Sequence, residues 1–215
     1  MKTLTREVRD ALTSNMVLDV LRRGNDRFVN NLKANRNLLE QVNETSEGQH
    51  PMAIVLSCID SRTSAELIFD QGLGDIFSCR VAGNVLNEDM LGSMEFACKV
   101  AGAKAIVVLG HSRCGAIKGA CDGVKMGNLT ALLAKIQPAV EMEEETVDNR
   151  TSGNAEFVER VALHNVQLVQ QQIVERSDVL AAMLESGELA LVGGMYDVET
   201  GAVDFHDAFA AVSAA

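Results

Sequence analysis

The chain has 215 residues, 47% of them hydrophobic and 23% charged, a composition typical of a folded soluble protein rather than a disordered one. Its 19 basic and 30 acidic residues give a net charge of -11, which disfavours nucleic acid as a partner because phosphate-binding surfaces are basic. No apolar stretch approaches the roughly 20 residues of a membrane-spanning helix, so we expect no membrane insertion.

The first ten residues carry scattered charges where a secretion signal would be continuously apolar. The five cysteines are an odd number in a chain long enough to fold without disulfides, which argues against a disulfide framework. We therefore expect a cytoplasmic protein, or a periplasmic one if a signal peptide has been removed. We also expect some of the cysteines to be functional thiolates.

The first forty residues carry apolar side chains at helical spacing, with a break expected at Gly24 and Asn25. From Pro51 onward, short β-branched runs alternate with helix-length segments, which predicts an α/β fold with a mostly parallel sheet flanked by helices. Residues 196–203 predict strand, turn and strand, which would make the last of about five strands an antiparallel edge. The other expected strands span 53–56, 76–81, 105–109 and 189–192, and two of the expected helices span 90–100 and 156–175.

No repeat or flexible linker divides the chain, so we expect one domain over residues 1–215. We divide it into a helical arm, residues 1–45, and an α/β core, residues 50–215. Five of the eight residues at 141–148 are acidic, and we expect this segment to be a solvated loop or helix face without a special function.

Polar side chains follow two of the expected strands. Residues 57–62 follow the first strand and residues 110–115 follow the third. Because functional sites of open α/β sheets form outside the carboxyl ends of the strands, we expect the two segments to meet there.

Cys58, His111 and Cys114 offer two thiolates and one imidazole, a set suited to tetrahedral zinc. Three protein ligands leave a fourth position for water or substrate, and Asp60 could also occupy it. Residue chemistry alone leaves three interpretations open: a catalytic zinc site, a structural zinc site, and a metal-free thiol or redox site.

The motif Cys-x-Asp-x-Arg at residues 58–62, followed by His-x-x-Cys at 111–114, resembles the signature of the β-class carbonic anhydrases. The similarity to the family's pattern covers most of the chain, and the active-site residues resemble the plant-type (type I) members. Further similar segments occur in the expected order at residues 24–28, 74–77, 80–84 and 194–197.

The resemblance implies a lyase, carbonic anhydrase, that converts carbon dioxide reversibly to bicarbonate and a proton by attack of zinc-bound hydroxide, with one Zn²⁺ per subunit. It also implies an arm that packs on a partner subunit, in a homodimer or a dimer of dimers. Carried over residue by residue, Cys58, His111 and Cys114 are the zinc ligands. Asp60 and Arg62 form a catalytic dyad beside the fourth position, with Asp60 as the fourth ligand in a closed state.

The resemblance further implies a small substrate pocket to which two subunits contribute, with Gln49 and Phe96 coming from opposite subunits. His50, next to Gln49, is a candidate for carrying protons away because a histidine pKa lies near neutrality. The implied substrate contacts are Gln49, Phe77, Ala82, Phe96 and the backbone N–H of Gly115.

One departure bears on regulation. Members that close in response to bicarbonate have a tryptophan where this chain has Val55, so we expect no such switch here and expect Arg80 to serve the fold. Three alternatives stay open: a related CS₂ or COS hydrolase on the same scaffold, a non-catalytic zinc- or bicarbonate-binding protein, and a structural zinc domain. Asp60 and Arg62 disfavour the non-catalytic binder, because zinc storage needs neither.

Overall fold

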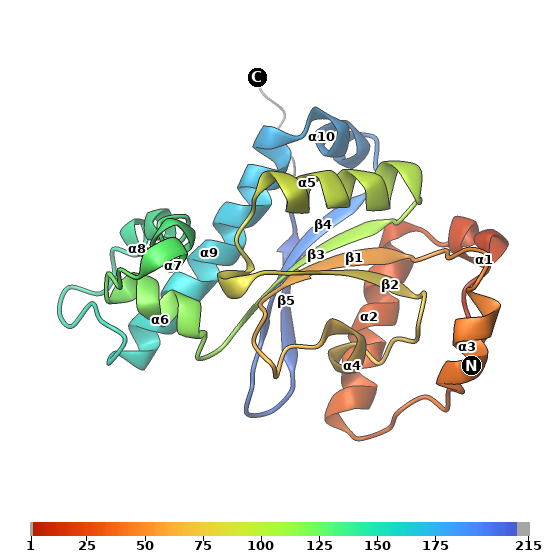
Figure 1. The fold of residues 1–215 in the computed structure, drawn as a ribbon, viewed down its shortest axis with the longest axis horizontal. Coiled ribbons are helices and arrows are strands. Elements are labelled where there is room, and N and C mark those ends of the chain that lie inside the picture. The colour runs from red at the N-terminus through yellow and green to blue at the C-terminus, as the bar shows by residue number, and fades with distance from the viewer. Residues whose placement is uncertain (1, 210–215) are drawn as a thin grey trace.

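The computed structural model describes residues 2–209, so residue 1 and residues 210–215 of the expected domain lie outside the described part of the chain. Within that part, a five-stranded sheet has the order β2-β1-β3-β4-β5 (Figure 1). The first four strands are parallel, and β5 runs antiparallel to β4 at one edge, as expected. The strands are Ala53–Ser57 (β1), Ile76–Arg80 (β2), Ala105–His111 (β3), Ala190–Tyr196 (β4) and Val203–Ala208 (β5).

The central strands β1 and β3 are buried along their whole length, which explains why their sequences are continuously apolar rather than alternating. The edge strand β2 alternates between more and less buried positions instead. The side chains of β1 and β3 point alternately to the two faces of the sheet. Helices are therefore needed on both sides to bury them.

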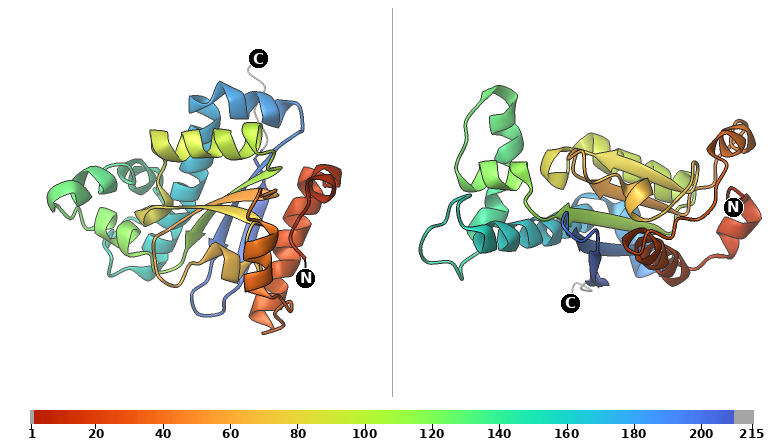
Figure 2. Two further views of the ribbon diagram at one scale, coloured as in Figure 1. Left: turned by 45° about the vertical axis from the view of Figure 1, so that its right-hand side comes forward. Right: turned by 90° about the horizontal axis from the view of Figure 1, so that it is seen from below.

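Helices cover both faces (Figure 2). They are Ser14–Val29 (α2) and Ala65–Ile68 (α4) on one face, and Glu88–Glu95 (α5), the π-helical turn Phe96–Val100 (η2), Ala155–Arg176 (α9) and Asp178–Glu185 (α10) on the other. On the first face, Val17 and Leu21 of α2 are buried against Val107 and its neighbours. On the second face, Ile106 and Val108 pack on the opposite set of helices. The expected helices at 90–100 and 156–175 are confirmed within a few residues.

Three short helices lie between β3 and α9. They are Gly115–Cys121 (α6), Gly127–Leu133 (α7) and Gln137–Met142 (α8). Ile117 of α6, Leu133 of α7 and Ile136 just before α8 share a buried cluster with Phe157 and Val161 of α9. Because α6 begins directly after Cys114, this cluster anchors one end of the expected metal-ligand segment.

The helix α2 runs without interruption through Gly24 and Asn25, so the break expected there is wrong. Gly24 is needed for close packing, since a Cβ atom at this position would lie 1.8 Å from the carbonyl oxygen of Phe69. Asn25 donates to the carbonyl oxygens of Ile68 at 3.1 Å and Gly201 at 2.9 Å. The pair therefore fastens the helix to the end of α4 and to the turn between β4 and β5.

The expected arm, residues 1–45, consists of two differently placed parts. The helix α2 buries Val17, Leu18 and Leu21 on its own subunit's sheet. The flanking helices Arg6–Ala11 (α1) and Leu38–Glu44 (α3) lie at one side of the molecule (Figure 2) and expose Val8, Leu38 and Leu39. Packing of the arm on a partner subunit stays a prediction, and α2 also offers apolar surface for it, since Met16 and Val29 are 48% and 44% exposed.

The acidic segment 141–148 is only partly the solvated loop that we expect. Glu143 is buried, accepts a hydrogen bond from the backbone N–H of Thr146 at 3.0 Å and is ion-paired with Arg150 at 2.8 Å and Arg160 at 3.2 Å. Burial raises the pKa of Glu143, but these hydrogen bonds and charges outweigh it and lower the pKa overall. One acidic residue of the run therefore holds the connection between α8 and α9 together.

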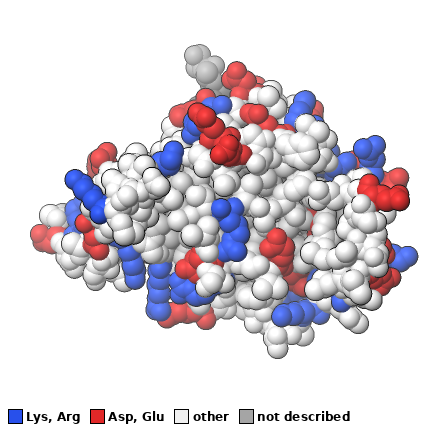
Figure 3. Space-filling model, viewed as in Figure 1, with Lys and Arg blue, Asp and Glu red and all other residues white. Residues whose placement is uncertain are grey.

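All five cysteines are free thiols. Among residues 2–209, no helix combines the length and apolarity needed to cross a bilayer. On the face shown in Figure 3, acidic and basic side chains are interspersed.

Candidate metal centre

The carboxyl ends of β1 and β3 bring three buried donor side chains together. The two strands are parallel neighbours, with Ser57 opposite Leu109, so the residues after them meet at one edge of the sheet. One ligand atom each from Cys58, His111 and Cys114 lies within 4.8 Å of the others. The two sulfur atoms are 4.0 Å apart, close to the spacing of about 3.8 Å that two thiolates have on one tetrahedral zinc ion.

The imidazole of His111 is oriented by a backbone contact. Its Nδ1 atom lies 2.9 Å from the carbonyl oxygen of Ser112, which can only accept, so Nδ1 carries the proton. The other ring nitrogen, Nε2, is buried and has no hydrogen-bond partner among the described residues. A free lone pair in this position is what a metal ion needs.

The two thiols are coupled. Their mutual contact, assisted by contacts with His111 and backbone N–H groups, lowers the pKa of Cys58 below that of a free thiol. The same contact and burial raise the pKa of Cys114. A divalent cation would allow both thiols to ionise, and two sulfurs with one imidazole are the donor types that zinc prefers. These residues therefore fit a zinc ion.

Asp60 lies beside this donor set, paired with Arg62. Arg62 donates through Nε to Oδ1 at 2.9 Å and through Nη2 to Oδ2 at 2.8 Å, and its backbone N–H also donates to Oδ1 at 3.0 Å. These hydrogen bonds hold the pKa of Asp60 well below its usual range, despite partial burial, and raise the pKa of Arg62. Asp60 is not one of the residues whose donor atoms lie within 4.8 Å of one another, so the pair keeps its carboxylate apart from the three donors.

The loop that carries Cys58 and Asp60 is braced from two sides. Arg80, at the end of β2, donates to the carbonyl oxygens of Cys58 at 3.0 Å and Asp60 at 2.7 Å. The hydroxyl of Thr63 lies 2.9 Å from each of the same two oxygens. The expectation that Arg80 serves the fold agrees with these contacts.

The sequence alone did not identify two sets of contacts that position Cys58: those of Thr63, and those made by Gly83 and Asn165. The turn Ala82–Asn84 (η1) places the N–H of Gly83 3.3 Å from Cys58 Sγ, and Asn165 of α9 donates to the carbonyl oxygen of Gly83 at 2.9 Å. A signal was present, because Asn165 interrupts the apolar stripe of the expected helix at 156–175.

The implied substrate-contact residues fall into three places. Ala82 and Gly115 are chain neighbours of Gly83 and Cys114 and therefore lie next to the donor set. Phe77 and Phe96 contact each other, with ring centroids 6.4 Å apart, and line a hollow of about 620 Å³ with Ile54.

Phe77 lies opposite Ile54 in the sheet. Ile54 comes four positions before Cys58, so Phe77 lies about 13 Å along the strand direction from the position of Cys58.

Gln49 and His50 lie at the opposite end of β1 from Cys58. Gln49 is exposed, and His50 lines a hollow formed with residues 3–7 of the arm. The five residues of β1 alone separate the two ends by about 17 Å. Within one subunit, neither side chain belongs to the metal centre.

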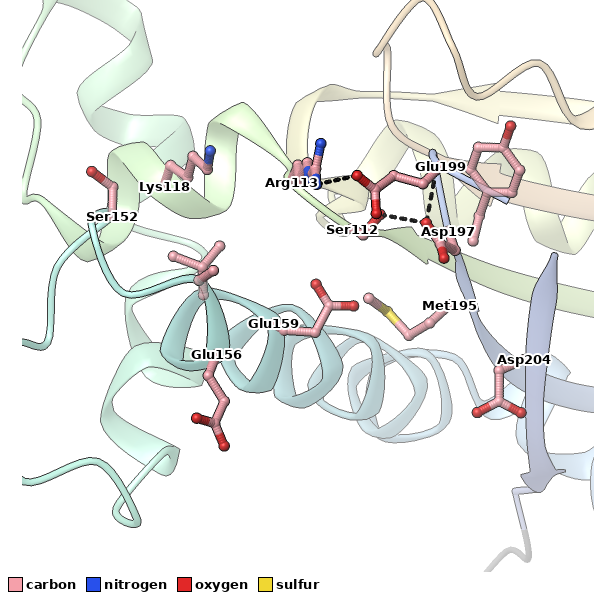
Figure 4. Close-up of a pocket in the computed structure, with 13 residues that line it drawn as sticks. Ser112, Arg113, Lys118, Ser152, Glu156, Glu159, Met195, Asp197, Glu199 and Asp204 are labelled. Carbon is pink, nitrogen blue, oxygen red and sulfur yellow. Dashed lines mark hydrogen bonds and ion pairs between the residues drawn. The ribbon is translucent and has the colours of Figure 1, made fainter. Parts of the chain in front are cut away.

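A further cavity of about 610 Å³ borders the loop between His111 and Cys114 (Figure 4). Both acidic and basic side chains line it, and Arg113 forms an ion pair with Glu199. Burial raises the pKa of Glu159, and the charge of Asp197 adds to the effect. None of the three metal donors is among its lining residues, so this cavity is separate from the metal centre.

The fold and the site define a metal centre of two thiolates and one imidazole at the carboxyl edge of a parallel α/β sheet. The sequence profile of the carbonic anhydrase family matches residues 53–203. Carbonic anhydrase 2 of Mycobacterium tuberculosis is 33% identical over 193 residues, which cover 87% of this chain and 90% of the relative. The carbonic anhydrase of Mycolicibacterium smegmatis is 34% identical over 190 residues, with 86% and 89% covered.

Solved structures agree with the sequence relatives. The β-carbonic anhydrase CafA of Aspergillus fumigatus superposes with a TM-score of 0.70 and 30% identity, covering 80% of this chain and 83% of that one. The chain belongs to the β-class carbonic anhydrase family, which confirms the resemblance seen in the sequence. Enzymes of this family are zinc-dependent lyases, and Cys58, His111 and Cys114 form the matching metal site.

Proposed function

We propose that this protein catalyses the reversible hydration of carbon dioxide to bicarbonate and a proton. The observation that carries the proposal is the placement of three buried metal donors beside Asp60, whose carboxylate Arg62 holds by two hydrogen bonds. A structural zinc site would need no such pair. Family membership supports the same reaction.

Cys58, His111 and Cys114 would hold the zinc ion, which would supply a hydroxide nucleophile by lowering the pKa of water. Asp60 is ionised at neutral pH and stays so under more acidic conditions because Arg62 lowers its pKa, so its carboxylate can only accept hydrogen bonds. We assign Asp60 the task of accepting a hydrogen bond from the nucleophile and orienting its lone pair toward carbon dioxide.

Arg62 keeps Asp60 available for that task. The bidentate pair fixes the carboxylate in one orientation and away from the metal donors. The closed state, with Asp60 as a fourth ligand, requires this pair to break. The observed contacts therefore support an open resting state.

We assign substrate contacts to Ala82 and the backbone N–H of Gly115 from the same subunit as the metal ligands. Gln49 lies at the far end of β1, so we assign the glutamine of each site to the partner subunit. The exposed ring of Phe96 and its neighbour Phe77 would then lie where two subunits meet.

We propose a homodimer or a dimer of dimers as the assembly. Exposed Val8, Leu38 and Leu39 give the arm an apolar surface that a second copy can cover. The unpaired edge of β2 offers a further contact. The β-carbonic anhydrases of Sordaria macrospora, whose structures share this fold with a TM-score of 0.69, are described as tetrameric.

We place the protein in the cytoplasm, because its cysteines are all free thiols, as is usual in a reducing compartment.

Stopped-flow measurement of carbon dioxide hydration from pH 7 to pH 9 tests the proposed function, with zinc quantified in the same sample. We expect fast hydration at about one zinc per chain. The rate should rise with pH, because two thiolates neutralise the charge of the zinc ion and make its bound water less acidic than three imidazoles would.

Hydrolysis of CS₂ and COS is measured in parallel, with a Cys58→Ser variant as the control that lacks one ligand. Full zinc without carbon dioxide hydration at any pH would overturn the proposal. Turnover of CS₂ or COS in that case would identify the related hydrolase instead.

A further inference from the structure

The turn η1 aims one backbone N–H at a metal-ligand sulfur. Gly83 donates to Cys58 Sγ at 3.3 Å from a left-handed backbone conformation, with φ of 67°. A Cβ atom at Gly83 would lie 2.7 Å from Cδ1 of Ile136 and 3.2 Å from Cβ of Ala116. The left-handed backbone conformation favours glycine here, and any side chain would also have to displace the terminal methyl group of Ile136.

Asn165 holds this turn from the other side. It lies within α9, is 1% exposed, and donates from Nδ2 to the carbonyl oxygen of Gly83 at 2.9 Å. Its Oδ1 atom is buried and has no hydrogen-bond partner in the described part of the chain. A leucine of similar volume would fill the same space without an unsatisfied acceptor. Packing alone therefore does not account for an asparagine at this position.

We propose that Asn165 is a positioning residue of the metal centre, acting through Gly83 to keep an N–H group on the sulfur of Cys58. A hydrogen bond to a thiolate withdraws electron density from sulfur, so it weakens donation to the metal and leaves the metal a stronger Lewis acid. The catalytic consequence rests on the proposed function, whereas the effect on the metal is measurable without substrate.

The test compares Asn165→Leu with Gln170→Met. The first variant removes the donor and nearly preserves side-chain volume. The second is a matched control, because Gln170 is another buried polar residue of α9 but lies against Gly193 rather than Gly83. Zinc affinity is measured by competition with a chelator. The thiolate-to-metal charge-transfer band is recorded after substitution of zinc by cobalt.

We expect Asn165→Leu to bind zinc about tenfold more weakly, because the turn that orients Cys58 is no longer held in place and this loss outweighs the stronger donation of a sulfur without the hydrogen bond. Its cobalt charge-transfer band should move to longer wavelength, because a sulfur without the hydrogen bond donates more readily. Gln170→Met should match the parent protein in both measurements.

Parental affinity and spectrum in Asn165→Leu would overturn the proposal. Equal changes in both variants would also overturn it, since they would indicate general loosening of α9. If the leucine variant does not fold, Asn165→Ala removes the donor without adding bulk and is held to the same expectation. Absence of carbon dioxide hydration in the parent protein would refute the proposed function but leave this comparison intact.

Discussion

At the scale of single residues, Asp60 and Arg62 distinguish a catalytic zinc site from a site that only binds zinc. Arg62→Ala removes both side-chain hydrogen bonds from the carboxylate and frees Asp60 to approach the metal. Asp60→Asn weakens the acceptor that orients the nucleophile. We expect each variant to keep its zinc and to lose about 100-fold in hydration rate, measured by stopped flow with metal analysis on the same sample.

Arg113→Ala is the control for this prediction. Arg113 lies between two of the metal ligands, but its side chain is exposed and pairs with Glu199 rather than Asp60. Exposed ion pairs contribute little to stability, so this variant should fold like the parent protein. Because Arg113 does not contact Asp60, the variant should also retain parental turnover. Full zinc and near-parental rates in both the Asp60 and Arg62 variants would show that the dyad has no catalytic role.

At the scale of secondary structure elements, the position of α2 depends on one missing side chain. Gly24→Ala would place a Cβ atom 1.8 Å from the carbonyl oxygen of Phe69, a rigid backbone atom, so the helix must move away from the sheet. We expect a loss of about 2 kcal/mol or more in the free energy of unfolding, measured by urea denaturation.

Gly92→Ala is the matched control, because Gly92 also lies within a helix but a Cβ atom there would have nothing within 4 Å of it. Alanine should stabilise that helix by up to about 1 kcal/mol. Similar effects of the two substitutions on unfolding would contradict the role assigned to Gly24.

The segment that links α2 to α3 is held by Asp70. Its carboxylate accepts from Arg27 Nε at 2.5 Å, from Arg36 Nη1 at 2.5 Å and from the backbone N–H of Ala34 at 3.1 Å. Burial raises the pKa of Asp70, but these hydrogen bonds outweigh it and lower the pKa overall. A lowered pKa stabilises the fold above the unfolded value of about 4, and this stabilisation is lost as pH falls through the folded pKa.

Asp70→Asn should therefore cost on the order of 3 kcal/mol at neutral pH, because it leaves two arginines without their carboxylate. The difference from the parent protein should stay constant down to about pH 5 and shrink below about pH 4. Urea denaturation across this range measures it. Asp19→Asn, which breaks the exposed Asp19–Arg22 pair on α2, should change stability by less than about 0.5 kcal/mol at every pH. A pH-independent difference for Asp70→Asn would contradict the assignment.

The sequence predicts elements best where one local signal has one physical meaning. The continuous apolar runs of β1 and β3 predict buried parallel strands because burial on both faces leaves no other pattern, and the polar residues after them form the metal site. A glycine, in contrast, can either interrupt a helix or permit a close contact within one. At Gly24 it permits a close contact with Phe69, 45 positions away, which no local pattern contains. For Asn165 the local pattern marks a polar residue in an apolar stripe but not its partner Gly83, which is distant in the sequence.

At the scale of the whole molecule, the position of Gln49 bears on the assembly. The sequence places Gln49 nine residues before Cys58, and the structure places an extended strand between them. A strand cannot fold back, so one subunit cannot bring both residues to one site. If Gln49 contacts substrate, then each active site consists of metal ligands from one subunit and a glutamine from its partner.

Shared sites predict complementation between two impaired variants. Gln49→Ala keeps its metal ligands, and Cys58→Ser keeps its glutamine. When the two are co-expressed, half of the dimers are mixed, and each mixed dimer has one complete site, so about one quarter of parental activity should return. Differently tagged chains allow the mixed dimer to be isolated and its hydration rate and zinc content to be measured.

The control pairs Cys58→Ser with Cys114→Ser. Both residues belong to the same subunit's metal site, so mixing these variants restores no complete site. Recovery in the first mixture and none in the second would locate Gln49 at the partner's metal centre. If activity in the first mixture is only the mean of its two parents, Gln49 does not act across the interface.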